Sequence, residues 1–146
     1  MKPSMSKTME NRPLDIVKYL LNNDPFSQWM GVELLEASEG FCKISCTVRH
    51  EMLNGFNVTH GGIIFSLADS ALAFSAATFG RVSLSIDNSV SFVKKSETDE
   101  KLTATSRCIN LTHKTGIFEV EVKNSSDELI ALMKSTVYRT SEEFPV

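Results

Sequence analysis

Cysteine is scarce in this sequence, and its spacing indicates neither disulfides nor a metal site. The 146 residues contain three cysteines, an odd number, and no two of them have the CxxC spacing of a typical zinc site. We therefore predict no metal ion, and nothing in the sequence points to a cofactor. Cys42 and Cys46 fall on the same side of a predicted strand as Ile44, which favours packing in the core.

An excess of positive charge is also missing. The 15 basic residues are outnumbered by 18 acidic ones and the formal net charge is −3, so no nucleic-acid partner is predicted. Residues 1–13 lack the apolar core of a signal peptide, and we expect them to form a flexible N-terminal tail. The length fits one domain, predicted over residues 14–146, in the cytoplasm.

The most distinctive segment runs from Gly61 to Phe79 and is almost wholly apolar or small. Its only ionisable residue is Asp69, and no polar stripe interrupts it, so a helix here is expected to be buried on every side. A membrane span is disfavoured, because a carboxylate at mid-span costs about 2.5–3.5 kcal/mol. We predict a central helix wrapped by a sheet, with no membrane partner.

Alternating apolar and polar residues predict strands on both sides of this helix. A short amphipathic helix over 14–22 comes first and ends before Pro25, because proline disfavours the helical conformation in the residue that precedes it. Phe26, Trp29 and Met30 then form an aromatic clamp, expected to cover the core or to line a ligand pocket. The strands are predicted over residues 31–38, 40–49, 82–93, 101–111, 117–124 and 129–139.

Together these elements predict an α+β fold, in which a curved antiparallel sheet of about six strands wraps around one long central helix. Within the strand over 82–93, serines are expected on one face. The other face is expected to carry Leu84, Ile86, Val90 and Phe92. The far face and the edges of such a sheet need cover, and we expect the serine-rich face to lie against a second subunit.

The start of the central helix offers a site for a negatively charged oxygen. The first backbone N–H groups of a helix lack intrahelical partners and carry the positive end of the helix dipole. Gly61 and Gly62 have no side chains to block a carbonyl oxygen, so this end could form an oxyanion hole. Asp69 lies about 12 Å further along the axis, too far to reach the same atom. We predict an active site shared with Asp69 of a second subunit.

These residues resemble the motif of the hotdog-fold acyl-CoA thioesterases, and within them the PaaI-like subgroup of phenylacetic acid degradation. The motif consists of Asn54-Gly55, His60-Gly61-Gly62, and Asp69 within LADSA. The similarity extends over about 26–140. It implies a hotdog fold, homodimers that pair into a homotetramer, and metal-free hydrolysis of acyl-CoA thioesters.

The resemblance implies a role for each residue of the motif. Asp69 is the expected catalytic carboxylate, acting as a general base on water or as a nucleophile. The N–H of Gly61, with Gly62 beside it, is expected to bind the thioester oxygen. His60 is expected to shape this corner and contact the thioester, and Asn54 to position the water or the acid.

Two further groups of polar residues match more loosely. A hydroxyl on the strand over 82–93 is expected to hold the attacking water. Ser85 fits best, with Ser83 and Asp87 as alternatives. Coenzyme A carries phosphates, and its candidate partners are Lys94, Lys95, His113 and Lys114. Lysines at strand ends also serve as solvated guards of a sheet edge, so that alternative stays open.

Each assignment has a structural alternative. Asn54-Gly55 is also a hairpin-turn pattern, His60 could cap the helix, and a glycine pair permits close packing of helix on sheet. A purely structural, hydrogen-bonded Asp69 is the weaker alternative, because a buried acid in an apolar helix costs energy and invites a functional explanation.

Two other functions fit the same fold. A non-catalytic acyl-CoA-binding or sensing protein would keep the groove and lose the acid. A hydratase or dehydratase would pair an acid with a histidine in a different motif. The presence of Asp69 after the His-Gly-Gly motif favours a thioesterase, with aryl-acyl or medium-chain acyl-CoA as substrate. Release of free thiol from an acyl-CoA is expected from the thioesterase and from neither of the other two.

Overall fold

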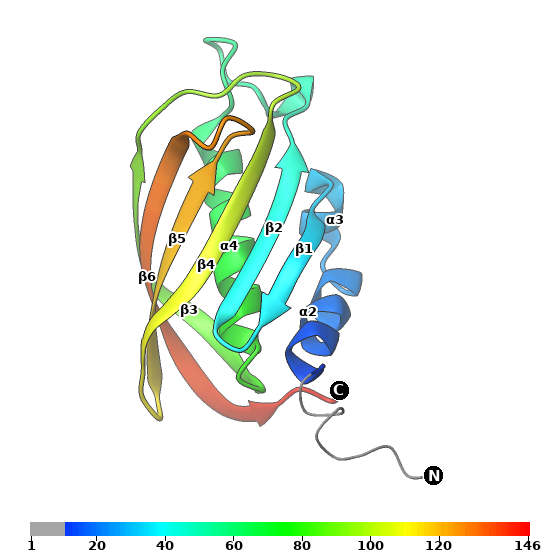
Figure 1. Cartoon of the computed structure of the whole chain (residues 1–146), viewed down its shortest axis with the longest axis vertical. Coiled ribbons are helices and arrows are strands. Elements are labelled where there is room, and N and C mark those ends of the chain that lie inside the picture. The colour runs from blue at the N-terminus through cyan, green and yellow to red at the C-terminus, as the bar shows by residue number, and fades with distance from the viewer. Residues whose placement is uncertain (1–10) are drawn as a thin grey trace.

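One antiparallel sheet of six strands curves around helix α4 (Figure 1). The computed structural model describes residues 11–146. Strands neighbour one another in the order β1-β2-β4-β5-β6-β3, and every pair is antiparallel. The elements are α2 (Arg12–Asn22), α3 (Pro25–Met30), β1 (Glu33–Ser38), β2 (Phe41–Thr47), a 3-10 turn (His50–Met52), α4 (Gly61–Ala77), β3 (Arg81–Phe92), β4 (Lys101–Leu111), β5 (Thr115–Lys123) and β6 (Leu129–Glu143). The predicted α+β fold class and the central helix are confirmed.

Helix α2 begins two residues before the predicted start, at Arg12. Pro13 occupies its first turn, where a missing backbone N–H costs nothing because no intrahelical acceptor is available there. Of the predicted flexible tail over 1–13, residues 1–10 lie outside the described part of the chain. The remaining residues of that segment lead into the helix, so there the tail prediction is wrong.

Helix α3 occupies the segment in which the sequence predicts an aromatic clamp. Asp24 caps this helix, since its side chain accepts a hydrogen bond from the Ser27 N–H at 2.9 Å. Met30 is buried, but Phe26 and Trp29 are each about half exposed and stack on one another with ring centroids 5.9 Å apart. The two aromatic rings therefore lie on the surface, and the prediction that they cover the core is wrong.

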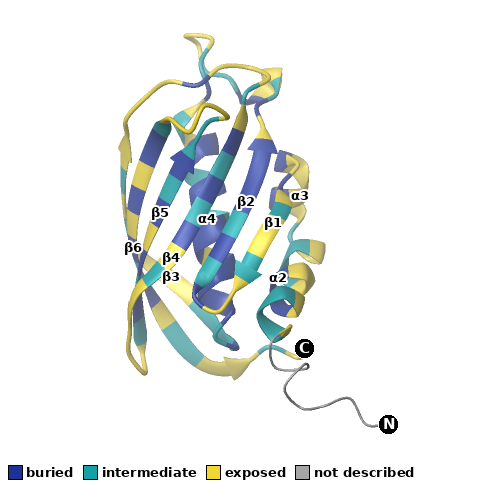
Figure 2. Ribbon diagram, viewed as in Figure 1, coloured by how far each residue is buried: buried dark blue, intermediate teal, exposed yellow. Residues whose placement is uncertain are grey.

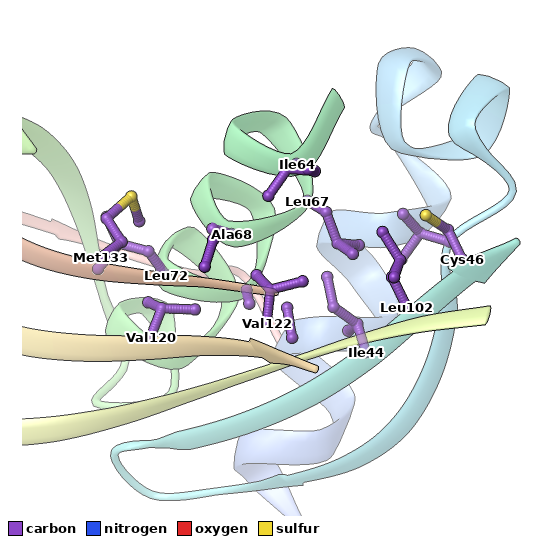
Figure 3. Close-up of a cluster of buried hydrophobic side chains, with 14 of the residues drawn as sticks. Ile44, Cys46, Ile64, Leu67, Ala68, Leu72, Leu102, Val120, Val122 and Met133 are labelled. Carbon is purple, nitrogen blue, oxygen red and sulfur yellow. The ribbon is translucent and has the colours of Figure 1, made fainter. Parts of the chain in front are cut away.

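The core lies between α4 and the concave face of the sheet (Figure 3). Side chains from α4 and from β2, β4, β5 and β6 meet there, among them Ile44, Leu67, Leu72, Leu102, Val120 and Met133. Cys42 and Cys46 belong to this core as free thiols, which confirms their predicted packing role. Burial raises the pKa of Cys42 to about 12 and that of Cys46 to about 11, so both stay protonated and unreactive at neutral pH.

Helix α4 is not buried on every side, and that prediction is wrong. The sheet leaves open one stripe at helical spacing, made of Gly62, Phe65, Ser66, Asp69 and Ala73. We call it the open stripe. All of its members except the phenylalanine are small or polar. The sequence suggests a helix that is apolar on every side because glycine and alanine are counted as apolar. Among residues 11–146, no helix combines the length and apolarity needed to cross a membrane.

Strand β3 is an edge of the sheet, and its side chains do not alternate as predicted. It pairs only with β6, and a β-bulge between Ser85 and Asp87 leaves Ile86 without a partner. The bulge shifts the pleat by one residue. Leu84 is therefore 57% exposed, whereas Val90 packs against the core. The prediction of one apolar face and one serine face is wrong, and Figure 2 shows exposed residues along much of β3.

Candidate active site

Helix α4 begins with one free backbone donor. His60 is the N-cap residue, and its Nδ1 accepts a hydrogen bond from the Gly62 N–H at 2.8 Å. The N–H of Gly61 has no acceptor among the residues that the structure describes. It therefore remains available to a ligand, at the positive end of the helix dipole. Gly62 differs from its neighbour, because its N–H is occupied.

The cap fixes both His60 and the glycine that follows it. Because Nδ1 accepts a hydrogen bond, the neutral imidazole carries its proton on Nε2. The backbone N–H of His60 donates to the Met52 carbonyl at 2.8 Å, which anchors the residue. A Cβ on Gly62 would lie 2.9 Å from Nδ1, so any side chain there would displace the cap. The structural alternative for His60, a helix cap, is thus what the geometry shows.

A pocket of about 290 Å³ lies beside the free N–H. Its walls come from the loop before α4, the first turn of α4 and the end of β3. They are Val58, Thr59, Gly61, Ile64, Phe92, Val93, Lys94 and Lys95. Phe92 covers the helix start so closely that a Cβ on Gly61 would lie 3.3 Å from its ring. The pocket therefore combines an apolar lining with one backbone donor and two lysines.

Asn54 holds the loop that leads to this pocket. Its side-chain oxygen accepts hydrogen bonds from the N–H groups of Phe56 at 2.9 Å and Val58 at 3.4 Å. Asn57 completes the turn with a φ of +58°, a conformation that asparagine tolerates well. The oxygen of Asn54 is thus committed to the loop, and only its Nδ2 group remains to contact a substrate or water.

Asp69 is the only ionisable residue on the open stripe. It is half-buried, and burial raises the pKa of its carboxyl above the usual range of aspartate. No hydrogen bond or cation within the described part of the chain offsets this shift. A structural, hydrogen-bonded role for Asp69 therefore has no contact to support it, and the carboxylate is available as a base.

Strand β3 separates the three candidates for holding the water. Ser83 donates its hydroxyl proton to the carbonyl of Arg81 at 3.2 Å, within its own strand. Asp87 lies after the bulge, opposite the half-buried Thr136 and on the outer face of the sheet. Ser85 lies opposite the buried Val137, on the face toward α4. Of the three, Ser85 combines a place on the side of the helix with a hydroxyl proton that has no acceptor among the described residues.

Lys94 and Lys95 line the pocket, and each lies beside an acid. Lys94 pairs with Glu128, and the Nζ of Lys95 is 3.4 Å from a carboxylate oxygen of Glu97. All four side chains are well exposed. Exposed ion pairs of this kind contribute only about 0–1 kcal/mol, so a phosphate could replace either carboxylate at little cost.

His113 and Lys114 lie at the opposite end of the molecule. They belong to the β4–β5 turn, at the lower end of Figure 1, whereas α4 begins at the upper end. Arg81 and Arg139 hold this turn, since their side chains donate to the carbonyls of His113 and Thr112. One chain therefore does not bring His113 and Lys114 near the pocket. Within residues 11–146 there is also no group of three or more potential metal ligands.

The sequence matches a known family and several known proteins. The pattern of the thioesterase superfamily matches residues 56–131. A provisionally named esterase of Archaeoglobus fulgidus is 44% identical over 127 residues, covering 87% of this chain and 82% of that protein. The acyl-coenzyme A thioesterase PaaI of Escherichia coli (strain K12) is 29% identical over 120 residues, covering 82% of this chain and 86% of that protein.

Solved structures share the fold. The PaaI protein from the phenylacetic acid degradation operon of E. coli superposes with a TM-score of 0.90 at 26% identity, over 92% of this chain and 98% of that chain. A hypothetical thioesterase of Streptococcus pneumoniae TIGR4, solved with coenzyme A, gives 0.81 at 20% identity, over 86% and 98%. At that identity the likeness concerns the fold alone. The expected hotdog fold and the resemblance to PaaI-like thioesterases are confirmed.

Proposed function

The chain belongs to the thioesterase superfamily, and we propose that it hydrolyses acyl-CoA thioesters to a free acid and coenzyme A. The observation that carries the proposal is the Gly61 N–H, which is unpartnered in the described residues and borders an apolar pocket. A thioester carbonyl oxygen gains negative charge when the carbon is attacked, and a fixed N–H there would stabilise that charge. The carboxylate of Asp69, which has no hydrogen-bond or ion-pair partner within residues 11–146, supplies the base.

The reaction needs one base and little help from an acid. Asp69 takes a proton from water, the water oxygen bonds to the thioester carbon, and the carbon–sulfur bond then breaks. The leaving thiolate has a pKa of about 8.5, judged from cysteine, so it departs without a strong acid. Burial raises the pKa of Asp69 and makes its carboxylate a better base near neutral pH.

Direct attack by Asp69 on the thioester is the second route within this proposal. It would form a mixed anhydride, which water then hydrolyses. A single turnover in heavy-oxygen water distinguishes the routes. Label in the aspartate would favour the anhydride, and label only in the released acid would favour the general base.

The active site requires two copies of the chain in this proposal. Asp69 and Gly61 are separated by about 12 Å along one helix, whereas reacting atoms approach within about 3–3.5 Å. The open stripe of α4 and the unpaired edge of β3 are the surfaces through which a second copy would bring its Asp69 to this Gly61. A two-fold axis gives two sites in each homodimer, and paired dimers give the homotetramer.

Mixed dimers test the shared site. A dimer of one Asp69→Ala subunit and one Gly61→Val subunit carries both defects in one site and none in the other. Each parent dimer should be inactive and the mixture should recover activity. Mixtures without any recovery would rule out a site shared between subunits.

Phosphates of coenzyme A are proposed to bind at the basic residues beside the pocket. Lys94 and Lys95 line it directly. In a dimer with this two-fold axis, the β4–β5 turn of the second copy, with His113 and Lys114, would lie toward Lys94 and Lys95 of the first. The four predicted basic residues would then contribute from two subunits to one coenzyme A.

The acyl group is proposed to be aromatic or of medium length. Ile64, Phe92 and Val93 give the pocket an apolar lining. Phe65, on the open stripe, would extend it where a second copy meets the first. Because its three cysteines are free thiols, we also propose that the enzyme works in the reducing cytoplasm.

A panel of acyl-CoA esters tests the proposed function. Thiol release is measured with aryl-acyl and fatty-acyl esters, with Asp69→Asn as the matched control. We expect turnover by the wild-type protein and almost none by the variant. Binding without thiol release would instead indicate the sensing protein, and loss of substrate without thiol release would indicate a hydratase.

A further inference from the structure

The bulge in β3 places two polar side chains on one face of the strand. Residues three apart in a regular strand point to opposite faces. Here Ser85 lies opposite Val137 and Asn88 lies opposite Ser135, with the extra residue Ile86 between them. Val137 and Ser135 are both buried, so Ser85 and Asn88 both lie on the face toward α4. Bulges often re-aim side chains beside active sites.

A hydrogen bond between these residues fixes the direction of the Ser85 hydroxyl. The Nδ2 group of Asn88 donates to the Oγ of Ser85 at 2.7 Å. A hydroxyl has one proton, and since its oxygen already accepts this bond, its O–H group is left to donate elsewhere. In the described chain, the buried Oδ1 of Asn88 has no hydrogen-bond partner. An unpaired buried amide oxygen lowers stability, so its presence calls for a compensating role.

Asn88, whose Nδ2 group donates to the Ser85 hydroxyl, lies near the level of Asp69 along the helix. Helix α4 and strand β3 run in opposite directions, joined by a short turn at the lower end of Figure 1. Gly61 at the helix start contacts Phe92 at the strand end. Asp69 is about 12 Å from Gly61 along the helix, and the strand covers that distance in about four residues. Counting back from Phe92 reaches Asn88.

We propose that Asn88 is a positioning residue for hydrolysis, which holds the Ser85 hydroxyl so that it donates to the attacking water beside Asp69. This inference rests on the proposed function. The water has two protons and two lone pairs. One proton goes to the Asp69 carboxylate and the other stays on the oxygen, while one lone pair accepts a hydrogen bond from the Ser85 hydroxyl and the other lone pair attacks the thioester carbon. A hydroxyl free to rotate would compete with the water for the carboxylate.

Two substitutions of Asn88 test this arrangement. Asn88→Ala removes the donor, and kcat should fall about tenfold with KM unchanged, as for one well-placed hydrogen bond. Asn88→Asp has nearly the same shape but only accepts, so it would turn the Ser85 proton away from the water and lower kcat further. Asn110→Ala, an exposed amide on β4, is the matched control and should leave kcat unchanged.

A double variant shows whether Asn88 acts through Ser85. If it does, Ser85→Ala with Asn88→Ala should be no slower than Ser85→Ala alone. Losses of kcat that multiply in the double variant would overturn the inference, as would an unchanged kcat in Asn88→Ala. A rise in KM in place of a fall in kcat would overturn it too. Thermal midpoints are recorded for every variant, and a kcat loss that follows the midpoint would assign Asn88 a structural role only.

The proposed function can fail separately. A wild-type protein that releases no thiol from any ester would overturn the thioesterase proposal and this inference together. Wild-type turnover combined with an unaffected Asn88→Ala variant would overturn only the inference.

Discussion

The polar groups at the two ends of helix α4 differ in whether they have hydrogen-bond partners. At the C-terminal end the hydroxyls are buried and paired. Ser75 Oγ lies 2.6 Å from Ser106 Oγ, and Thr78 Oγ1 accepts the Gly40 N–H at 2.8 Å. At the N-terminal end the Gly61 N–H, unpaired in the described chain, borders a pocket. The closed end joins the helix to the sheet, whereas the open end keeps its hydrogen-bonding capacity for a ligand.

The largest effect is expected at Asp69, on the open stripe between these ends. Asp69→Asn keeps the shape of the side chain and removes the base. Loss of a general base lowers rates about 10²–10⁴-fold, so kcat should fall by that factor. Thiol release from a well-used acyl-CoA measures it. A kcat near that of the wild type would contradict the role of Asp69 as the catalytic base.

The same variant should not lose stability. Because burial raises the folded-state pKa of Asp69 above its unfolded value, the ionised carboxylate lowers the stability of the folded state at neutral pH. That cost is relieved as the pH falls through the raised folded pKa toward the ordinary value of about 3.9. Urea unfolding should show this gain in the wild type and not in Asp69→Asn. Equal pH slopes in the two proteins would contradict it.

The closed end should behave in the reverse manner. Thr78→Val keeps the volume but removes the acceptor for the buried Gly40 N–H. Leaving a buried donor unpaired costs about 1–3 kcal/mol, so the free energy of unfolding should fall by that amount while kcat stays unchanged. Urea unfolding and thiol release are the two measurements. Thr105→Val, on the outer face of β4, is the matched control, expected within about 0.5 kcal/mol of wild type.

The contrast between the two ends also shows what the sequence can predict. Period-two alternation depends on pleat and burial alone, so the strand over 101–111 is predicted to the residue. The predicted helix over 61–79 is two residues longer than the observed one, which ends at Ala77. Thr78 and Phe79 continue the small and apolar composition, so composition alone does not show where the helix ends. The open end is predicted because the first N–H groups of a helix lack intrahelical acceptors, and glycines at the first two positions leave them accessible.

Other features depend on contacts that no local pattern encodes. The bulge at Ile86 arises from the pairing of β3 with β6, so strict alternation assigned the wrong face to Leu84 and put Ser85 and Asn88 on opposite faces. The short helix α3 depends on the cap formed by Asp24, a polar residue that the aromatic pattern nearby obscures. The far position of His113 follows from strand lengths and turn direction, which the sequence leaves open.

A smaller effect is expected at the cap of the open end. His60→Ala removes the acceptor for the Gly62 N–H. An N-cap contributes about 0.5–2 kcal/mol, and a less ordered helix start should lower kcat about tenfold. His60→Asn is the informative partner, since asparagine is itself a good N-cap. We expect it to keep most of the activity. A loss as large as that of His60→Ala would show that the imidazole contacts the thioester.

The smallest effect is expected at the lysines beside the pocket. Reversing the charge of Lys94 and Lys95 together should raise KM for acyl-CoA about two- to fivefold with little change in kcat, because two exposed contacts together contribute only about 0.4–1 kcal/mol. The increase should shrink with added salt, which screens charges beyond about 8 Å at 0.15 M. An acyl-pantetheine, which lacks the nucleotide phosphates, is the matched substrate, and its KM should not change. Equal effects on both substrates would remove phosphate binding from the roles of these lysines and leave them as guards of the sheet edge.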